Sequence, residues 1–309
     1  MPYILFLHGF PSSHYDWRYQ IPFFAERGYG IIAPDLLGYG GTDKPTDPGA
    51  YRMRKMSREV AGILDCEGIE SVHGVGHDWG SPLLSRMANY FPERFRSYTF
   101  IDVGYIDPST HFNREELEEI NAQGLQTLGY APFGYFFYQA DPSSAALIDS
   151  HFDSFFTLWY TSAYQPLWIT DLTPLGALER WLKADRRAPL GNWTTEEDRE
   201  THRRIFIGNG GYQGALKWYT VSFNGLNVAE DNAIPPERAL LDKPVLLLAA
   251  TRNPIGGADF AEALTRPFAP DLRVERLPTG HWIQLEAAYQ TNVFLESFFL
   301  DVIDGSGAD

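Results

Sequence analysis

Cysteine is almost absent from this sequence, which has one cysteine in 309 residues. A single cysteine excludes a framework of disulfide bonds, so we expect the protein in a reducing compartment, the cytoplasm. The residue itself, Cys66, follows Ile63 and Leu64 in a stretch with helical spacing. We therefore expect Cys66 to be a packed small side chain rather than a nucleophile.

Runs of positive charge and long apolar runs are missing too. The formal net charge is −15, from 25 Lys and Arg against 40 Asp and Glu, which argues against nucleic acid or an anionic membrane surface as a partner. No apolar stretch approaches the length that spans a membrane, and we see neither a basic leader nor an internal repeat. We expect a frayed end over residues 304–309. A chain of 309 residues can bury a large core, as one large domain or as a core with an insertion.

The segment 72–80 is the one around which the rest of the sequence is organised. A short apolar run leads into Gly76-His77-Asp78-Trp79-Gly80, and residues 81–88 have helical spacing. A strand that turns sharply into a helix exposes the middle residue of the turn, and glycine is needed on either side because a Cβ would collide with its neighbours. Serine is the usual nucleophile at such a turn, but here the position holds Asp78, and Ser81 falls in the helix. A carboxylate needs no base to activate it, so we predict that Asp78 is a catalytic nucleophile.

Strands and helices alternate on both sides of this segment. The apolar run 3–7 is typical of a strand buried on both faces of a parallel sheet, and further strands are expected at 30–35, 72–77, 98–101, 245–250 and 273–277. The pattern predicts an α/β fold with a doubly wound, mostly parallel sheet joined by right-handed crossovers. Ligands of such sheets bind beyond the carboxyl ends of the strands, where Phe10, Asp78 and Asp102 all fall.

The alternation stops between residues 107 and 236. This segment has helical stretches, no convincing strand and many aromatic residues, for example at 133–138 and 155–160. We predict a helical cap domain over 107–236, inserted between the two parts of the core, 1–106 and 237–309. Such an insertion is a lid over the active site. Most of its aromatic residues are expected to hold the cap together and a minority to face a substrate cavity.

In their order and spacing, several pieces of the chain resemble the α/β-hydrolase superfamily and, within it, the soluble epoxide hydrolases. They are His8-Gly9-Phe10-Pro11, the loop Asp35 to Gly40, the segment Gly76 to Gly80, the cap tyrosines and Gly280-His281-Trp282. The resemblance covers essentially the whole chain. It implies hydrolysis of an apolar or aromatic epoxide to a vicinal diol through an ester of Asp78, without a metal ion or other cofactor.

The resemblance also implies roles for residues at the matching positions. The backbone N–H groups of Phe10 and Trp79 are expected to form an oxyanion hole, with a cis peptide bond before Pro11. His281 follows a strand and precedes the last helix, where the family places its catalytic base. Trp79 and Trp282 are expected to contact the substrate.

Two cap segments resemble those that carry the family's cap tyrosines, Phe133-Gly134-Tyr135-Phe136 and Gly214 to Tyr219. Opening an epoxide leaves an alkoxide, which phenolic O–H groups stabilise and protonate. We therefore expect Tyr135 and Tyr219 to bind the substrate and to protonate its oxygen, with Tyr138 in reserve for Tyr135.

The acid of the triad departs from the family pattern. After the strand 245–250 the family usually places an Asp that orients the histidine, whereas this chain has Asn253. An asparagine accepts a hydrogen bond but supplies no charge to stabilise an imidazolium. Asp102 follows the strand 98–101, where some dehalogenases place their carboxylate, so we predict a triad of Asp78, His281 and Asp102. An uncharged triad with Asn253, Asp259 as the acid, or no acid at all stays open.

A second departure lies at the start of the chain, where relatives usually have a strand pair before the strand 3–7. If that pair is missing, the strand at 31–34 becomes an exposed edge, and edges of this kind invite pairing with another chain. A homodimer through a partner surface at this edge is one expected outcome.

Three other functions remain open. Haloalkane dehalogenases share the Asp nucleophile and the histidine, but they generally hold the halide with an Asn at the position of Phe10, and a halide needs no proton from tyrosine. Fluoroacetate-type dehalogenases place an Arg after the nucleophile, where this chain has Trp79. The non-enzyme alternative is a hydrolase-fold protein that only binds an apolar ligand under the lid, and Asn253 is the observation that favours it.

Overall fold

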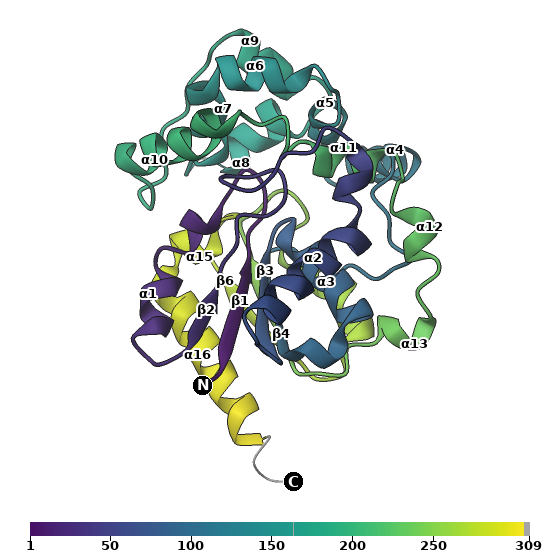
Figure 1. Ribbon diagram of the computed structural model, residues 1–309. Helices are drawn as coiled ribbons and strands as arrows, with labels where there is room; N and C mark the ends of the chain where they lie inside the picture. Colours follow the sequence, from purple (N-terminus) through teal and green to yellow (C-terminus); the bar gives the residue numbers. More distant parts are fainter. Residues whose placement is uncertain (163, 306–309) are drawn as a thin grey trace.

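The computed structural model describes residues 1–162 and 164–305 of the chain (Figure 1). Of the end that we expect to fray, residues 304 and 305 still belong to the last helix, and residues 306–309 lie outside the described residues.

A six-stranded sheet in the order β2-β1-β3-β4-β5-β6 forms the centre of the described chain. Every pair of neighbouring strands is parallel, which confirms the predicted fold class. The strands are β1 Tyr3–Leu7, β2 Gly30–Ile32, β3 Val72–His77, β4 Phe95–Ile101, β5 Val245–Ala250 and β6 Leu272–Leu277.

The apolar strands of the sheet are buried on both faces because their side chains alternate between two clusters. Ile4 and Phe6 of β1 belong to the cluster beneath α16, while Leu5 and Leu7 belong to the larger cluster that includes α2 and α3. In β5, likewise, Leu246 and Leu248 belong to the cluster beneath α16, and the residues next to them belong to the larger cluster. A strand between two layers of helices therefore needs a continuous apolar run, as the sequence shows.

Helices cover both faces of this sheet. In α2 the buried residues recur at helical spacing, so this helix turns one apolar stripe to the sheet. The core helices are α1 Gln20–Ala25, α2 Met53–Cys66, α3 Gly80–Tyr90, α14 Gly257–Thr265, α15 Ile283–Glu286 and α16 Ala288–Gly305, with short helical turns η1 His14–Trp17, η2 Pro48–Tyr51, η3 Pro92–Arg94 and η6 Arg266–Phe268.

Our prediction for Cys66 is wrong. The residue ends α2 and is exposed. The buried stripe of the helix runs through Met56, Val60 and Leu64, and Cys66 falls outside it, two residues beyond the last member.

The strand β2 lies at one edge of the sheet, where it pairs with β1 alone. It is shorter than the strand predicted at 30–35 because Pro34 has no N–H to donate to a ladder. The described structure thus leaves β2 as an edge strand, as we expected for this region.

Between β4 and β5 the elements are helical, apart from one isolated bridge between Thr161 and Leu190 in the described residues. Figure 1 shows most of these helices as a layer above the carboxyl ends of the strands, while α12 and α13 descend beside the core. The boundaries 107 and 236 of a cap domain remain a prediction. The helices are α4 Arg114–Thr127, α5 Tyr135–Gln139, α6 Ser144–Ser150, α7 Phe152–Trp159, α8 Tyr164–Leu167, a π-helical turn η4 Trp168–Leu172, α9 Ala177–Lys183, α10 Glu196–Phe206, η5 Ile207–Asn209, α11 Lys217–Phe223, α12 Val228–Asp231 and α13 Pro236–Ala239.

Hydrogen bonds from aromatic side chains join this helical layer to the core. The indole N–H of Trp218 donates to the carbonyl of Leu37 over 2.9 Å, and the hydroxyl of Tyr160 donates to the carbonyl of Pro11 over 2.8 Å. Both donors are buried, so breaking them would leave unpaired polar groups away from water. These two hydrogen bonds therefore fix the position of the helical layer on the loops that follow β1 and β2.

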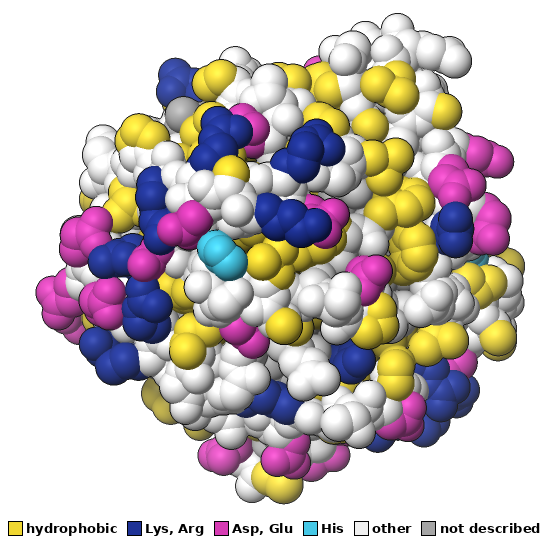
Figure 2. Space-filling view, turned by 90° about the horizontal axis from the view of Figure 1, so that it is seen from above, with side chains coloured by type: hydrophobic (Ala, Val, Ile, Leu, Met, Phe, Trp, Pro, Cys, Tyr) yellow, Lys and Arg dark blue, Asp and Glu magenta, His cyan; other side chains and the backbone are white. Residues whose placement is uncertain are grey.

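The outer surface of the helical layer is strongly charged on one side. Seen from above, Figure 2 shows side chains of both signs close together at the left, where α10 lies in Figure 1. There Arg199 and Arg203 both pair with Asp153 of α7. No helix of the described residues is long and apolar enough to cross a membrane.

Candidate active site

The turn after β3 has the geometry that the glycine pattern predicts. Asp78 adopts a positive φ of 51° between β3 and α3, a conformation that L-residues rarely adopt and that is found where structure imposes it. A Cβ on Gly80 would lie 2.0 Å from the carbonyl oxygen of Leu7, and one on Gly76 would lie 2.6 Å from the carbonyl oxygen of Gly80. The strand and the helix therefore approach too closely for any larger residue, and this approach holds the Asp78 carboxylate up at the carboxyl edge of the sheet.

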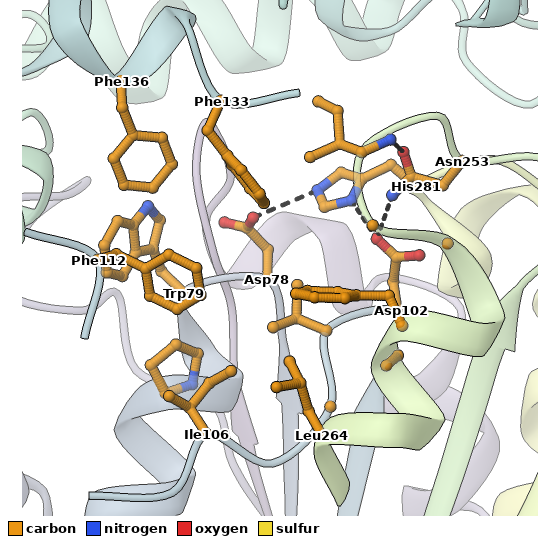
Figure 3. Close-up of a pocket in the computed structure, with 18 of the residues that line it drawn as sticks. Asp78, Trp79, Asp102, Ile106, Phe112, Phe133, Phe136, Asn253, Leu264 and His281 are labelled. Carbon is orange, nitrogen blue, oxygen red and sulfur yellow. Dashed lines mark hydrogen bonds and ion pairs between the residues drawn. The ribbon is translucent and has the colours of Figure 1, made fainter. Parts of the chain in front are cut away.

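Three of the predicted site residues lie in a row at this edge (Figure 3). The Nε2 atom of His281 is 3.6 Å from Oδ2 of Asp78, and its Nδ1 atom is 2.6 Å from Oδ2 of Asp102. Asp102 follows β4, and its φ of 64° is also positive. His281 thus has a carboxylate at each ring nitrogen, which is the arrangement of a nucleophile, a base and an orienting acid.

Asn253 contacts the acid rather than the histidine. Its side-chain N–H donates to Oδ2 of Asp102 over 2.7 Å, and its side-chain oxygen accepts from the backbone N–H of Ile255. The other predicted alternative, Asp259, has a side chain that is 93% exposed and pairs with Arg276. Asp102 is therefore the one of the three candidates that contacts the ring of His281.

The backbone donors that we expected for an oxyanion hole also face Asp78. The N–H of Phe10 donates to Oδ1 of Asp78 over 2.6 Å, and the N–H of Trp79 bonds to the same carboxylate. The peptide bond between Phe10 and Pro11 is cis, as predicted. Since Oδ1 already accepts from Phe10, Oδ2 is the oxygen that is free to attack a substrate.

The charges of the site are set by burial and by the ion pairs. Burial acts to lower the pKa of His281, but the hydrogen bond that its ring donates to Asp102 and the charges of Asp102 and Asp78 outweigh it and raise that pKa above its ordinary value. Burial raises the pKa of Asp78, with the charge of His281 and the two backbone N–H groups opposing it. The row of groups therefore favours a protonated imidazole while both carboxylates are charged.

These residues open into one cavity beneath the helical layer. Asp78, Asp102, Asn253 and His281 form its polar part. The rest is lined mainly by apolar and aromatic side chains of the core, of α5, α7, η4 and α11, and of the loops before α4 and α5, including Ile106, Phe112, Phe133, Phe136, Trp159, Trp168, Ile255, Phe260 and Leu264. The cavity suits an apolar molecule that brings one reactive polar group to Asp78.

Both predicted cap tyrosines line this cavity. Tyr135 begins α5 and Tyr219 lies in α11, and their ring centroids are 6.2 Å apart. Burial, together with the charge of Asp78, holds both pKa values well above the ordinary value for tyrosine. The two phenols are thus protonated near neutral pH, as a proton donor must be. The reserve candidate, Tyr138, is not among the residues that line the cavity.

Trp282 does not lie where we expected it. It is fully buried, its ring stacks on Tyr160 at a centroid distance of 4.5 Å, and its indole N–H donates to the carbonyl of Trp159. The Trp282 side chain packs at the interface between the core and the helical layer, because His281, the residue before it, occupies the side of the loop that faces the cavity. Trp79 does line the cavity.

Several cavity residues could not be found from the sequence. Phe112, Phe133 and Ile255 lie on loops, so no periodic pattern marks the face that they present. Phe136 stands next to a predicted residue and could have been chosen by that neighbourhood alone. The described residues contain no group of three or more His, Cys, Asp or Glu side chains that could hold a metal ion.

Comparisons with known proteins agree with this geometry. A family described as having the alpha/beta hydrolase fold matches residues 2–288. The chain is 26% identical to the bifunctional epoxide hydrolase 2 of Mus musculus over 95% of its own length and 51% of that protein, and 28% identical to epoxide hydrolase B of Mycobacterium tuberculosis over 96% and 91%. The chain thus spans about half the length of its mouse relative.

Solved structures give the same result. An epoxide hydrolase from an endophytic Streptomyces superposes with a TM-score of 0.82 at 28% identity, over 98% of this chain and 90% of that one. Epoxide hydrolase A from Mycobacterium thermoresistibile superposes with a TM-score of 0.77 at 27% identity, over 96% and 90%.

Proposed function

This chain belongs to the alpha/beta hydrolase fold family, and from that premise we propose that it hydrolyses apolar epoxides to vicinal diols through an ester of Asp78. The observation that carries the proposal is one cavity in which Asp78, His281 and two phenols face the same space. The epoxide hydrolases among its relatives and structural neighbours support the same reaction.

In the first step, Oδ2 of Asp78 attacks one carbon of the epoxide. The carbon–oxygen bond of the ring breaks, and its electron pair goes to the leaving oxygen, which takes a proton from Tyr135 or Tyr219. Oδ1 of Asp78 keeps its hydrogen bond from the N–H of Phe10 and becomes the carbonyl oxygen of the ester, while the N–H of Trp79 lies at the same carboxylate.

In the second step, water attacks that ester carbonyl while Nε2 of His281 takes a proton from the water. The negative charge that develops on Oδ1 is held by the same two backbone N–H groups. Asp102, 2.6 Å from Nδ1, stabilises the imidazolium. Collapse of the tetrahedral intermediate breaks the bond between the ester carbon and the substrate oxygen, which takes the proton held by His281. The proton left on the new Asp78 carboxyl returns to the tyrosinate, so the diol is released and Asp78, His281 and the phenol are restored.

The ester itself is the most direct test. In His281→Gln the first step needs no imidazole, so the ester should form and persist because no base activates the water. Intact-mass measurement after addition of an aryl epoxide should show a gain of one substrate mass in His281→Gln. Asp78→Ala should show no gain, and the matched variant His151→Gln, on the surface of the helical layer, should turn over like the wild type.

A variant His281→Gln that releases diol at the normal rate would remove His281 from the mechanism. The same incubations with 1-haloalkanes should release no halide, and halide release without diol formation would favour the dehalogenase alternative. The non-enzyme alternative rested on Asn253, which here donates to a carboxylate that contacts His281.

The setting of the enzyme belongs to the same proposal. One exposed cysteine and the absence of other thiols in the sequence support a location in the cytoplasm.

The edge strand β2 supports a homodimer in which two copies of the chain pair across this edge. Sedimentation of the wild type against Ile31→Lys, which charges the edge, should show a loss of dimer in the variant, and a monomeric wild type would contradict this part.

A further inference from the structure

A second carboxylate lies beside the loop that carries His281, and the reaction above does not use it. Glu286 ends the short helix α15. Its Oε1 accepts hydrogen bonds from the hydroxyl of Tyr164 over 2.7 Å and from the backbone N–H of Trp282 over 3.2 Å. Its Oε2 accepts from the backbone N–H of Gly280 over 3.0 Å.

The two backbone donors are the residues on either side of His281. A carboxylate that binds both of them fixes the peptide units before and after the histidine, and so fixes the direction of its side chain. A carboxylate that only closed the first turn of α15 would need the N–H of Trp282 but not that of Gly280. The bond to Gly280 therefore points to the position of His281 rather than to the helix.

The third donor, Tyr164, belongs to α8 of the helical layer. Its ring lies directly on the histidine loop, since a Cβ on Gly280 would come within 2.1 Å of it. Trp282 meets the same layer through its bond to the carbonyl of Trp159. The loop with His281 is thus held between Glu286 below and the helical layer above.

We propose that Glu286 is a positioning residue for His281, and that its hydrogen bond to Tyr164 makes the position of His281 depend on where the helical layer packs on the core. The inference rests on the proposed function, because it assigns a role within ester hydrolysis. Glu286 itself touches neither the substrate nor Asp78. It acts through the backbone on both sides of His281 and through its negative charge, which raises the pKa of that histidine.

Glu286→Gln tests the role with little change in shape. The amide has one acceptor oxygen in place of two and carries no charge, so it cannot hold both backbone N–H groups and Tyr164 together. Displacement of a catalytic group by about 1 Å costs on the order of 100-fold in rate, and we expect a loss of that size in ester hydrolysis with ester formation unchanged. The matched control is Glu296→Gln. Glu296 lies on α16 and forms an exposed ion pair with Arg27, so this variant loses the same charge and should behave as wild type.

Two readouts separate positioning from loss of fold. The first readout is the amplitude of the ester burst, which is proportional to the number of active sites. An unfolded fraction lowers this amplitude, whereas a misplaced His281 lowers the hydrolysis rate per site. The acid limb of hydrolysis should move to lower pH in Glu286→Gln, since the variant removes one of the charges that raise the pKa of His281. The titratable groups around Glu286 are Tyr164 from α8 and His281, with Asp102 on the far side of the ring.

Tyr164→Phe tests the link to the helical layer. Alone it should slow hydrolysis less than Glu286→Gln and leave the acid limb in place, because the charge and both backbone bonds remain. In a Glu286→Ala background, which removes every acceptor for the Tyr164 hydroxyl, it should add nothing because the link is already broken. Independent, additive effects of the two changes would contradict the coupling.

A substrate-free measurement keeps the inference separate from the proposed function. The imidazole of His281, assigned by comparison with His281→Gln, can be titrated by NMR in the wild type and in Glu286→Gln. A lower pKa and a changed ring environment in the variant are expected whether or not an epoxide is turned over. Unchanged titration and unchanged hydrolysis would overturn the role of Glu286, whereas a wild type that opens no epoxide would overturn the proposed function alone.

Discussion

Asp102 accepts two hydrogen bonds on a single oxygen, Oδ2, from His281 and from Asn253, while its other oxygen has no partner in the described structure. The asparagine therefore aligns the carboxylate for the histidine and adds no second charge. Burial raises the pKa of Asp102, and the bonds from His281 and Asn253 oppose that rise.

Asp102→Asn should slow hydrolysis of the ester by about two to four orders of magnitude while alkylation of Asp78 continues. The acid limb of hydrolysis should also move to lower pH. Hydrolysis needs neutral imidazole, the wild-type pKa of His281 is raised by Asp102, and removal of that charge lets the imidazolium lose its proton sooner. Single-turnover rates across pH would show both effects, and Asp259→Asn, at an exposed carboxylate, should show neither.

The tyrosines act in the other half of the reaction. Tyr219→Phe should slow ester formation by about one to three decades, the usual cost of losing an acid or a charge-stabilising donor. Tyr135→Phe should have an effect of the same kind, because both rings line the cavity. Rapid-quench measurement of the ester is the test. Tyr138→Phe, outside the cavity lining, serves as the control, and a larger loss there than in Tyr135→Phe would reassign the role.

At the scale of single elements, the contact between β3, α3 and β1 decides whether the nucleophile is presented at all. Gly80→Ala would place a methyl group against the backbone of Leu7 and His8. Backbone atoms cannot move aside as the end of a flexible side chain can. We therefore expect the free energy of unfolding to fall by about 1–3 kcal/mol, and we expect the turn that carries Asp78 to be displaced. Gly62→Ala in α2 meets no atom within 4 Å and should instead stabilise by about 0.5–1 kcal/mol. Chemical denaturation of the two variants gives the comparison.

The same elements show what a sequence can and cannot predict. The strands and the position of Asp102 after β4 follow from apolar runs and from the rule that ligands meet the carboxyl ends of parallel strands. The sequence does not reveal the roles of Trp282 and Glu286, because these roles depend on the helical layer that closes over them. Contacts between segments more than a hundred residues apart leave no periodic signal in either segment.

At the scale of the whole molecule, the net charge of −15 should act on any charged substrate. The protein repels an anionic epoxide before it reaches the cavity, and salt screens that repulsion over about 10 Å at 0.1 M. The kcat/KM for an epoxide with a carboxylate should therefore rise with ionic strength, while that of a neutral epoxide of equal size should stay flat. Equal salt dependence of the two would show that the charge near the cavity mouth differs from the overall charge.

The pairing of β4 with β5 sets a condition on any attempt to remove or exchange the helical layer. The two strands are parallel neighbours, so the chain leaves β4 at one edge of the sheet and must begin β5 at the opposite edge. A strand of six residues such as β5 is about 20 Å long at ~3.3 Å per residue. A shortened chain therefore needs a connection that runs back along the full length of a strand, and a tight loop cannot replace the layer. Chimaeras that graft a different lid onto this core should keep α13 and the segment that leads to it, and should exchange only what lies above the carboxyl edge.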